Sequence, residues 1–139
     1  MLSIDDIYDL FLWDASYSDE EYAAREKLGV EEASKLKNLY PFIQPVIMPP
    51  HKSKSVWEPC AKVIALKADE ELIPFLGLLF EWLQDMNWPG AGIVYNRLSK
   101  IPFANLEAEF RYTKHRAEKD GNETWLLALS DFGNIYNEE

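Results

Sequence analysis

Apolar side chains recur every three to four residues along most of this chain, which is the spacing of one face of an α-helix. Residues 4–11 show it first, and Ser3 is placed to cap that helix. A second helix is expected from Ser18, where Glu21 forms a capping box, to just before Gly29, a residue suited to a left-handed C-terminal cap. Two short N-terminal helices are therefore predicted.

A third helix is expected over residues 30–40, because Pro41 lacks an amide hydrogen and crowds the preceding turn. The prolines at 41, 45, 49 and 50 then forbid a long helix, so residues 41–55 are interpreted as a connector. Four of its residues are apolar enough to pack across it, namely Phe42, Ile43, Val46 and Ile47.

The C-terminal two thirds return to helical spacing. A helix is predicted from Val56 with an apolar face that includes Cys60 and ends at Leu66, and another is predicted to run without interruption from Asp69 through Leu83. Three more helices are expected, at residues 89–98, 104–118 (with Leu106, Phe110 and Tyr112 packed inward) and 124–132. No segment alternates as a strand would, so the fold is predicted to be all-α.

Two similar turns lie between these helices. Asp85, Met86 and Asn87 form an Asp-x-Asn turn that recurs at residues 120–122, and an apolar helical run follows each copy. Residues 57–66, 88–98 and 123–132 can be aligned as second helices of helix pairs. Pairs of this period stack because neither buries its apolar face alone. We therefore expect a single domain, a short α-solenoid of antiparallel helix pairs over residues 49–139 with an N-terminal helical extension over residues 1–48.

The composition of the chain limits the kinds of molecule that it is expected to bind. The chain has 139 residues, 47% of them hydrophobic, and a formal net charge of −10. A chain of this length buries a substantial core, and its negative charge repels a phosphate backbone, so a nucleic-acid partner is not expected. The first fifty residues are the more acidic part, with ten acids against four bases. A basic protein partner and a merely solvated exterior both fit this surface.

The single cysteine and the start of the chain bear on its location. Cys60 has no partner for an internal disulfide, and the sequence MLSIDDIYDL lacks the order of a signal peptide. The longest strongly apolar run, residues 72–80, is far shorter than the roughly 18 residues that would span a membrane. A cytoplasmic protein without a membrane segment is expected.

Few residues have a spacing that suggests catalysis or metal binding. Glu81 and Asp85 are four residues apart and could share a helix face as an acid/base pair. The candidate nitrogen and sulfur ligands, His51, His115 and Cys60, lack the paired spacing of a zinc motif. Cys60 falls on an apolar stripe, where a cysteine is usually a buried, inert residue. No catalytic residue, metal site or cofactor is therefore predicted.

The candidate binding residues are polar or aromatic side chains near the turns and the connector. Trp82 and Trp88 could form part of a ligand platform or could pack between repeats. Asp85 and Asn87 could bind a polar ligand, although Asx residues in turns more often accept amide hydrogens. His51 and Lys52 lie in a locally basic stretch, where a binding role and a solvated loop both remain open.

Three motifs carry a resemblance to a known family. They are PPHKSKS at residues 49–55, LLFEWLQDMNWPGA at 78–91 and DGNETWLLALS at 120–130. Together they resemble the uncharacterised bacterial domain family with the LLEWLQDMNWP signature, and the central hairpin resembles a HEAT repeat, although its basic residue, Arg97, comes late in the second helix. The resemblance covers about residues 49–131 and implies a helical, HEAT-like fold, with no established activity.

The leading hypothesis is a non-enzymatic bacterial protein that binds a protein or peptide on the surface of a short solenoid. A sharper version is an immunity-type protein that neutralises a basic toxin domain, since negative charge steers a basic partner. Two alternatives stay open. One is an enzyme with an unrecognised carboxylate site at Glu81 and Asp85, and the other is a structural module that forms oligomers through the ends of the stack.

Overall fold

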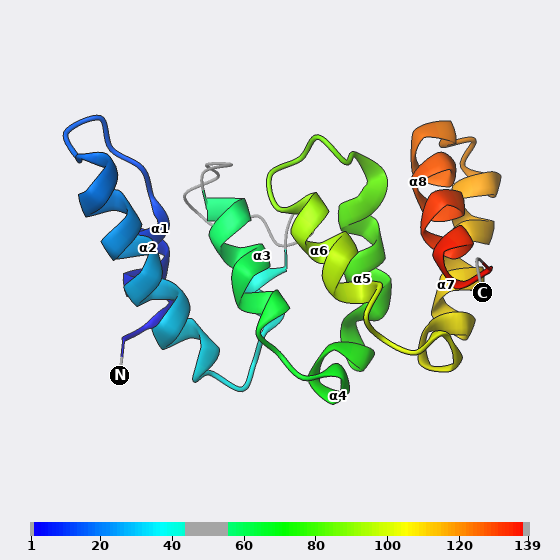
Figure 1. The fold of residues 1–139 in the computed structure, drawn as a ribbon, viewed down its shortest axis with the longest axis horizontal. Coiled ribbons are helices and arrows are strands. Elements are labelled where there is room, and N and C mark those ends of the chain that lie inside the picture. Colours follow the sequence, from blue (N-terminus) through cyan, green and yellow to red (C-terminus); the bar gives the residue numbers. More distant parts are fainter. Residues whose placement is uncertain (1, 44–55, 138–139) are drawn as a thin grey trace.

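The computed structural model describes residues 2–43 and 56–137, and every regular element within these ranges is a helix. The all-α prediction is confirmed. The helices lie side by side along the long axis of the molecule, with α6 between α3 and α5 and with the two termini at opposite ends (Figure 1). The α-helices are α1 (Ile4–Phe11), α2 (Asp19–Ser34), α3 (Trp57–Ala65), α4 (Asp69–Leu72), α5 (Leu76–Glu81), α6 (Ala91–Leu98), α7 (Phe103–Lys119) and α8 (Glu123–Asn134). Short 3-10 segments are η1 (Tyr40–Phe42), η3 (Ile73–Phe75), η4 (Trp82–Gln84) and η5 (Ile135–Asn137).

Helix α1 begins as the sequence predicts. The Ser3 hydroxyl accepts a hydrogen bond from the Asp6 amide at 3.1 Å, and the Asp6 carboxylate accepts one from the Ser3 amide at 3.2 Å. This reciprocal pair satisfies two amides that the first turn leaves without partners. Helix α2 also begins as predicted, with the Ser18 hydroxyl accepting from the Glu21 amide at 3.1 Å.

The predicted end of α2 at Gly29 is wrong. The helix continues through Gly29 to Ser34, so the two helices expected on either side of this glycine are one. Gly29 is buried and does not have a positive φ. A Cβ at this position would lie 2.6 Å from the Phe11 ring, so the glycine serves the close approach of α1 to α2 rather than a left-handed cap.

The third helix expected over residues 30–40 therefore does not exist as a separate element. The chain leaves α2 at Lys35, and Pro41 lies inside η1 instead of ending a helix. Phe42 and Ile43 are fully buried, which confirms that these two residues pack across the join. The rest of the predicted connector, residues 44–55, lies outside the described residues.

Helix α3 follows the predicted apolar face, with Trp57, Cys60 and Ile64 buried. Leu66 does not belong to that face, because it follows the last helical residue and is 63% exposed. Helix α3 contacts α2 on one side and α6 on the other.

The uninterrupted helix expected from Asp69 to Leu83 is also wrong. This segment consists of α4, η3, α5 and η4 in succession. Pro74 lies at the first break, where its missing amide hydrogen removes one bond from an α-helical ladder. The apolar residues keep their predicted positions nonetheless, and Leu72, Leu76, Leu79, Phe80 and Leu83 are all buried.

The C-terminal helices α7 and α8 match their predicted ranges closely. Leu106 and Phe110 are buried as expected, but Tyr112 is 61% exposed because it lies away from the face of α7 that carries those two residues. Trp125 links α8 to α5, because its indole N–H donates a hydrogen bond to the Phe80 carbonyl at 3.0 Å.

One cluster of buried hydrophobic residues extends from Ile7 in α1 to Phe132 in α8. The N-terminal helices therefore share a continuous core with the rest of the described chain. In residues 2–43 and 56–137, no helix combines the length and the apolar character needed to cross a membrane.

Candidate functional site

The turn at residues 85–88 contains three of the predicted binding residues. The Asp85 carboxylate accepts a hydrogen bond from the Asn87 amide at 2.8 Å, and the Asp85 carbonyl accepts one from the Trp88 amide at 3.0 Å. Asn87 is exposed, and the ring of Trp88 packs edge-on against Trp57 with centroids 5.6 Å apart. Asp85 and Trp88 thus have internal contacts that shape the turn, as the packing and turn interpretations of these residues require.

The residues around this turn explain the LLFEWLQDMNWPGA motif. Trp82 is fully buried, and its indole N–H donates to the Pro89 carbonyl at 3.1 Å, which closes the loop. Gly90 has a φ of 84°, and a Cβ there would lie 2.7 Å from the Cβ of Ala61 in α3. The motif therefore sets how closely the turn packs on α3.

The second Asp-x-Asn turn uses a different residue. Here the Asn122 side chain accepts a hydrogen bond from the Trp125 amide at 3.0 Å and caps α8. In the first turn the aspartate is the acceptor. The two turns are alike in sequence, but equivalent positions do not make equivalent bonds.

Two further predicted residues, His51 and Lys52, lie outside the described residues. Whether they approach the turn at 85–88 stays a prediction.

Glu81 and Asp85 do not form a converging carboxylate pair with free acceptors. The Glu81 carboxylate accepts from the Arg116 guanidinium at 3.0 Å, and that guanidinium also lies over the Trp125 ring, 5.5 Å from its centroid. Asp85 is engaged in its own turn. This geometry connects Glu81 with α7 and α8 rather than with Asp85.

Cys60 is completely buried in α3, as predicted. Burial raises the pKa of its thiol well above the ordinary value, so the reactive thiolate is not populated near neutral pH. Within residues 2–43 and 56–137, no group of three or more histidine, cysteine, aspartate or glutamate side chains is arranged to hold a metal ion.

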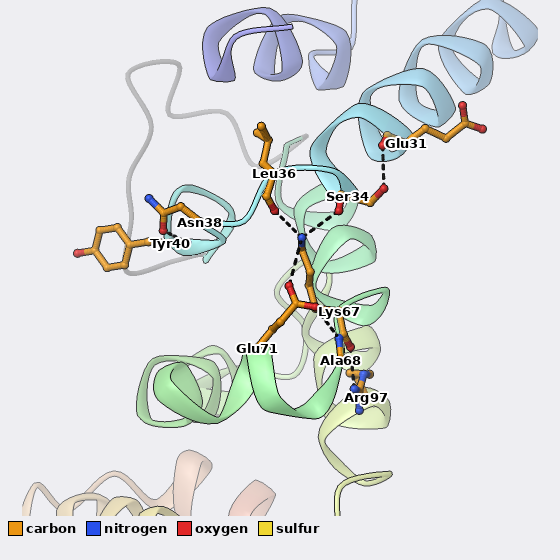
Figure 2. Close-up of polar contacts among 9 residues, drawn as sticks. All are labelled: Glu31, Ser34, Leu36, Asn38, Tyr40, Lys67, Ala68, Glu71 and Arg97. Atoms are coloured by element: carbon orange, nitrogen blue, oxygen red, sulfur yellow. Dashed lines mark hydrogen bonds and ion pairs between the residues drawn. The ribbon is translucent and has the colours of Figure 1, made fainter. Parts of the chain in front are cut away.

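The most unusual charged residue is Lys67, which follows α3 and is only 6% exposed. Its ammonium group donates to the Ser34 carbonyl at 3.0 Å and to the Leu36 carbonyl at 2.6 Å, and it lies 3.6 Å from the Glu71 carboxylate (Figure 2). Buried charges persist only when they are paired and hydrogen-bonded in this way. Lys67 thus joins the C-terminal end of α2 to the start of α4.

The sequence of α2 explains why a cation lies there. The last turn of α2 contains Glu31 and Glu32 and no basic residue, although the carbonyl end of a helix favours positive charge. Lys67 supplies that charge from a distant part of the chain. Sequence reasoning missed Lys67, and the only signal was its spacing of four residues from Glu71.

Arg97 extends this junction to α6. Its guanidinium donates to the Lys67 carbonyl at 2.8 Å (Figure 2). It also donates to the Asp69 carboxylate at 2.6 Å. Arg97 therefore stabilises the link between α3 and α4. The whole cluster has internal partners and is best understood as structural.

A groove of about 520 Å³ lies along α2 beside α3 and is termed here the α2–α3 groove. Its lining residues are Asp19, Tyr22, Ala23, Glu26, Lys27, Val30, Glu31 and, from α3, Lys62. Lys62 pairs with Glu26 across the groove. Apolar and acidic groups share this surface, which sequence reasoning did not identify because it combines elements far apart in the chain.

The electrostatic potential at one end of the α2–α3 groove is negative. The pKa of Tyr22 is raised, first by burial and then by the nearby carboxylates of Glu26 and Glu58. Two carboxylates that line the groove, those of Asp19 and Glu31, make no ion pair with another described residue. The groove therefore retains carboxylates available to a positively charged partner.

An all-α chain with this core and this central motif belongs to a recognisable family. Residues 47–125 match the family described as "Domain of unknown function (DUF5071)", and the chain is a member of that family. The match includes α3 to α7 and the turn at residues 85–90, and it begins after α1 and α2. No curated protein and no solved structure matches the chain.

Proposed function

We propose that this protein is a short HEAT-like α-solenoid that binds a basic protein or peptide and has no catalytic activity. Helices α3, α6 and α8 correspond to the three second helices that align in the sequence, and α2, α3 and α6 contact one another in succession. Stacked helix pairs of this kind present extended surfaces to partners.

The observation that carries the proposal is the α2–α3 groove. This groove has a volume of about 520 Å³, and its lining combines Tyr22, Ala23 and Val30 with the carboxylates of Asp19, Glu26 and Glu31. A partner with apolar and basic groups would bury the former and pair with the latter.

The enzymatic alternative has less support. Its best candidate pair, Glu81 and Asp85, is occupied by Arg116 and by the turn, respectively. A neutral, fully buried Cys60 offers no nucleophile to a substrate. The groove is therefore the better basis for a function.

A capture experiment with a matched pair of variants tests the proposal. Ala23 and Ala24 are adjacent and exposed on α2, but only Ala23 lines the groove. Ala23→Trp fills the groove, whereas Ala24→Trp adds the same bulk outside it. Each variant and the unmodified protein are used to capture partners from a lysate of the source cells, at low and at moderate salt, after circular dichroism has shown equal helix content.

The expected result is a basic protein that the unmodified chain and Ala24→Trp capture, that Ala23→Trp loses, and that is captured less well as salt rises. Capture of no basic partner, or equal capture by both variants, would contradict the proposed function or its location.

A further inference from the structure

The spacing of the groove residues points to the form of the partner. The seven residues that α2 contributes lie at positions 19, 22, 23, 26, 27, 30 and 31. Each of these residues lies three or four positions from another of them, so together they form one broad stripe along a single face of the helix. Lys62 of α3 borders that stripe.

A stripe of this kind is the surface onto which a second helix packs, because side chains at spacings of three and four form the ridges and grooves of helix packing. From residue 19 to residue 31 the stripe extends about 18 Å, the length of roughly 12 helical residues. The mixed small and medium side chains of Ala23 and Val30 leave room for apolar residues of a neighbour.

We infer that the α2–α3 groove binds an amphipathic basic α-helix of a partner protein. This inference rests on the proposed function and names the class of partner. The apolar face of the helix would pack on Tyr22, Ala23 and Val30, and its arginine or lysine residues would meet the rim.

Two places on the rim select for positive charge. At one end, Asp19 is exposed and has no ion-pair partner among the described residues, whereas Glu26 already pairs with Lys62. A cation near Asp19 therefore reaches its carboxylate without breaking an internal pair. At the other end, Glu31 is exposed and forms no ion pair with another described residue. Positive residues about 12 positions apart on one helix would reach both ends.

The test uses fluorescently labelled synthetic peptides of about 15 residues. One probe is an amphipathic helix with leucines at spacings of three and four and with arginines beside them. The second has the same composition in an order that destroys the apolar stripe. Binding of each to the full chain is measured by fluorescence anisotropy at low and at moderate salt.

A charge-matched pair of variants locates the binding. Glu31→Lys changes the groove, and Glu20→Lys makes the same change in charge on an exposed residue of α2 that does not line it. We expect the helical probe to bind at least about tenfold more tightly than the scrambled one. We expect Glu31→Lys to weaken binding about fivefold and Glu20→Lys to weaken it less than twofold.

Absence of binding by the helical probe, equal binding of the two peptides, or equal weakening by the two variants would overturn the inference. These outcomes are separable from failure of the proposed function. If the lysate experiment yields a basic partner whose capture Ala23→Trp abolishes, but the helical probe does not bind, the groove is a binding site and its partner is not a basic helix.

Discussion

Replacing Lys67 by methionine is expected to destabilise the protein although it removes no apolar contact. Methionine has a similar length and leaves no charge buried, so the cost of desolvating the ammonium group disappears with the lysine. The Ser34 and Leu36 carbonyls lose their hydrogen-bond donor, and the carbonyl end of α2 loses the cation that Lys67 places there.

The magnitude follows from these two carbonyls. Each buried acceptor left without a donor costs about 1–3 kcal/mol, and partial access of water to the half-buried Ser34 and Leu36 favours the lower part of that range. The loss of the ion pair adds little, because the Glu71 side chain is 44% exposed. We therefore expect Lys67→Met to lower the free energy of unfolding by about 2–3 kcal/mol.

Urea unfolding followed by tryptophan fluorescence and by circular dichroism measures this loss. With a slope of about 2 kcal/mol/M, the midpoint should fall by roughly 1–1.5 M. Lys62→Met is the matched control, since Lys62 also pairs with a glutamate of another segment but has a side chain that is 44% exposed. It should cost less than about 1 kcal/mol. Equal losses in the two variants, or a midpoint for Lys67→Met that matches the unmodified protein, would refute the reasoning.

Four other predictions concern the packing of α1 and α3, the turns and the Cys60 thiol. Gly90→Ala should lower the free energy of unfolding in urea by about 2–4 kcal/mol, because the new Cβ overlaps α3 at a position with a positive φ. Gly121→Ala also has a positive φ but meets open space, so it should lower that free energy by only about 1 kcal/mol. Similar losses in the two variants would refute the role of the overlap. Gly29→Ala should destabilise the protein by about 1–3 kcal/mol, because the new Cβ collides with α1. Gly92→Ala, whose Cβ meets nothing within 4 Å, should stabilise it by about 0.5–1 kcal/mol. Stabilisation by both variants would contradict the close approach of α1 to Gly29. The Cys60 thiol should react with a thiol reagent at pH 8 at least about a hundredfold more slowly in the native protein than in urea, and fast native labelling would show that it is accessible. Folding raises the pKa of the Cys60 thiol, so the folded protein keeps the thiol proton at a pH where the unfolded chain loses it. The free energy of unfolding of the unmodified protein should therefore fall as the pH rises above about 9. The fall should be smaller in Cys60→Ala.

Local signals in the sequence were enough to predict several helices. Ser3 and Ser18 cap α1 and α2, and apolar spacing identifies α3, α7 and α8, because each signal depends only on residues within a few positions of one another.

The errors came from residues whose role depends on distant contacts. Gly29 has the sequence context of a helix end, but its lack of a side chain serves the packing of Phe11 from another helix. Pro74 interrupts the helix predicted from Asp69, although the apolar spacing continues across it unchanged. Apolar periodicity reports which side chains face the core and says less about where the backbone ladder breaks.

The candidate site was harder to predict from the sequence than the fold. The turn containing Asp85 and Trp88 attracted attention because its residues are distinctive, and the structure gives those two side chains internal contacts. The α2–α3 groove joins a helix that precedes the family match to Lys62 within that match, so no local motif marks it.

The central claim, that a basic amphipathic helix lies along α2, is tested most directly by nuclear magnetic resonance of the isotopically labelled chain titrated with the helical probe. The account predicts that backbone amide shifts change mainly over residues 19–31 and near Lys62, with little change at residues 85–90. Changes centred on the turn at residues 85–90, or spread evenly over the acidic surface, would contradict it.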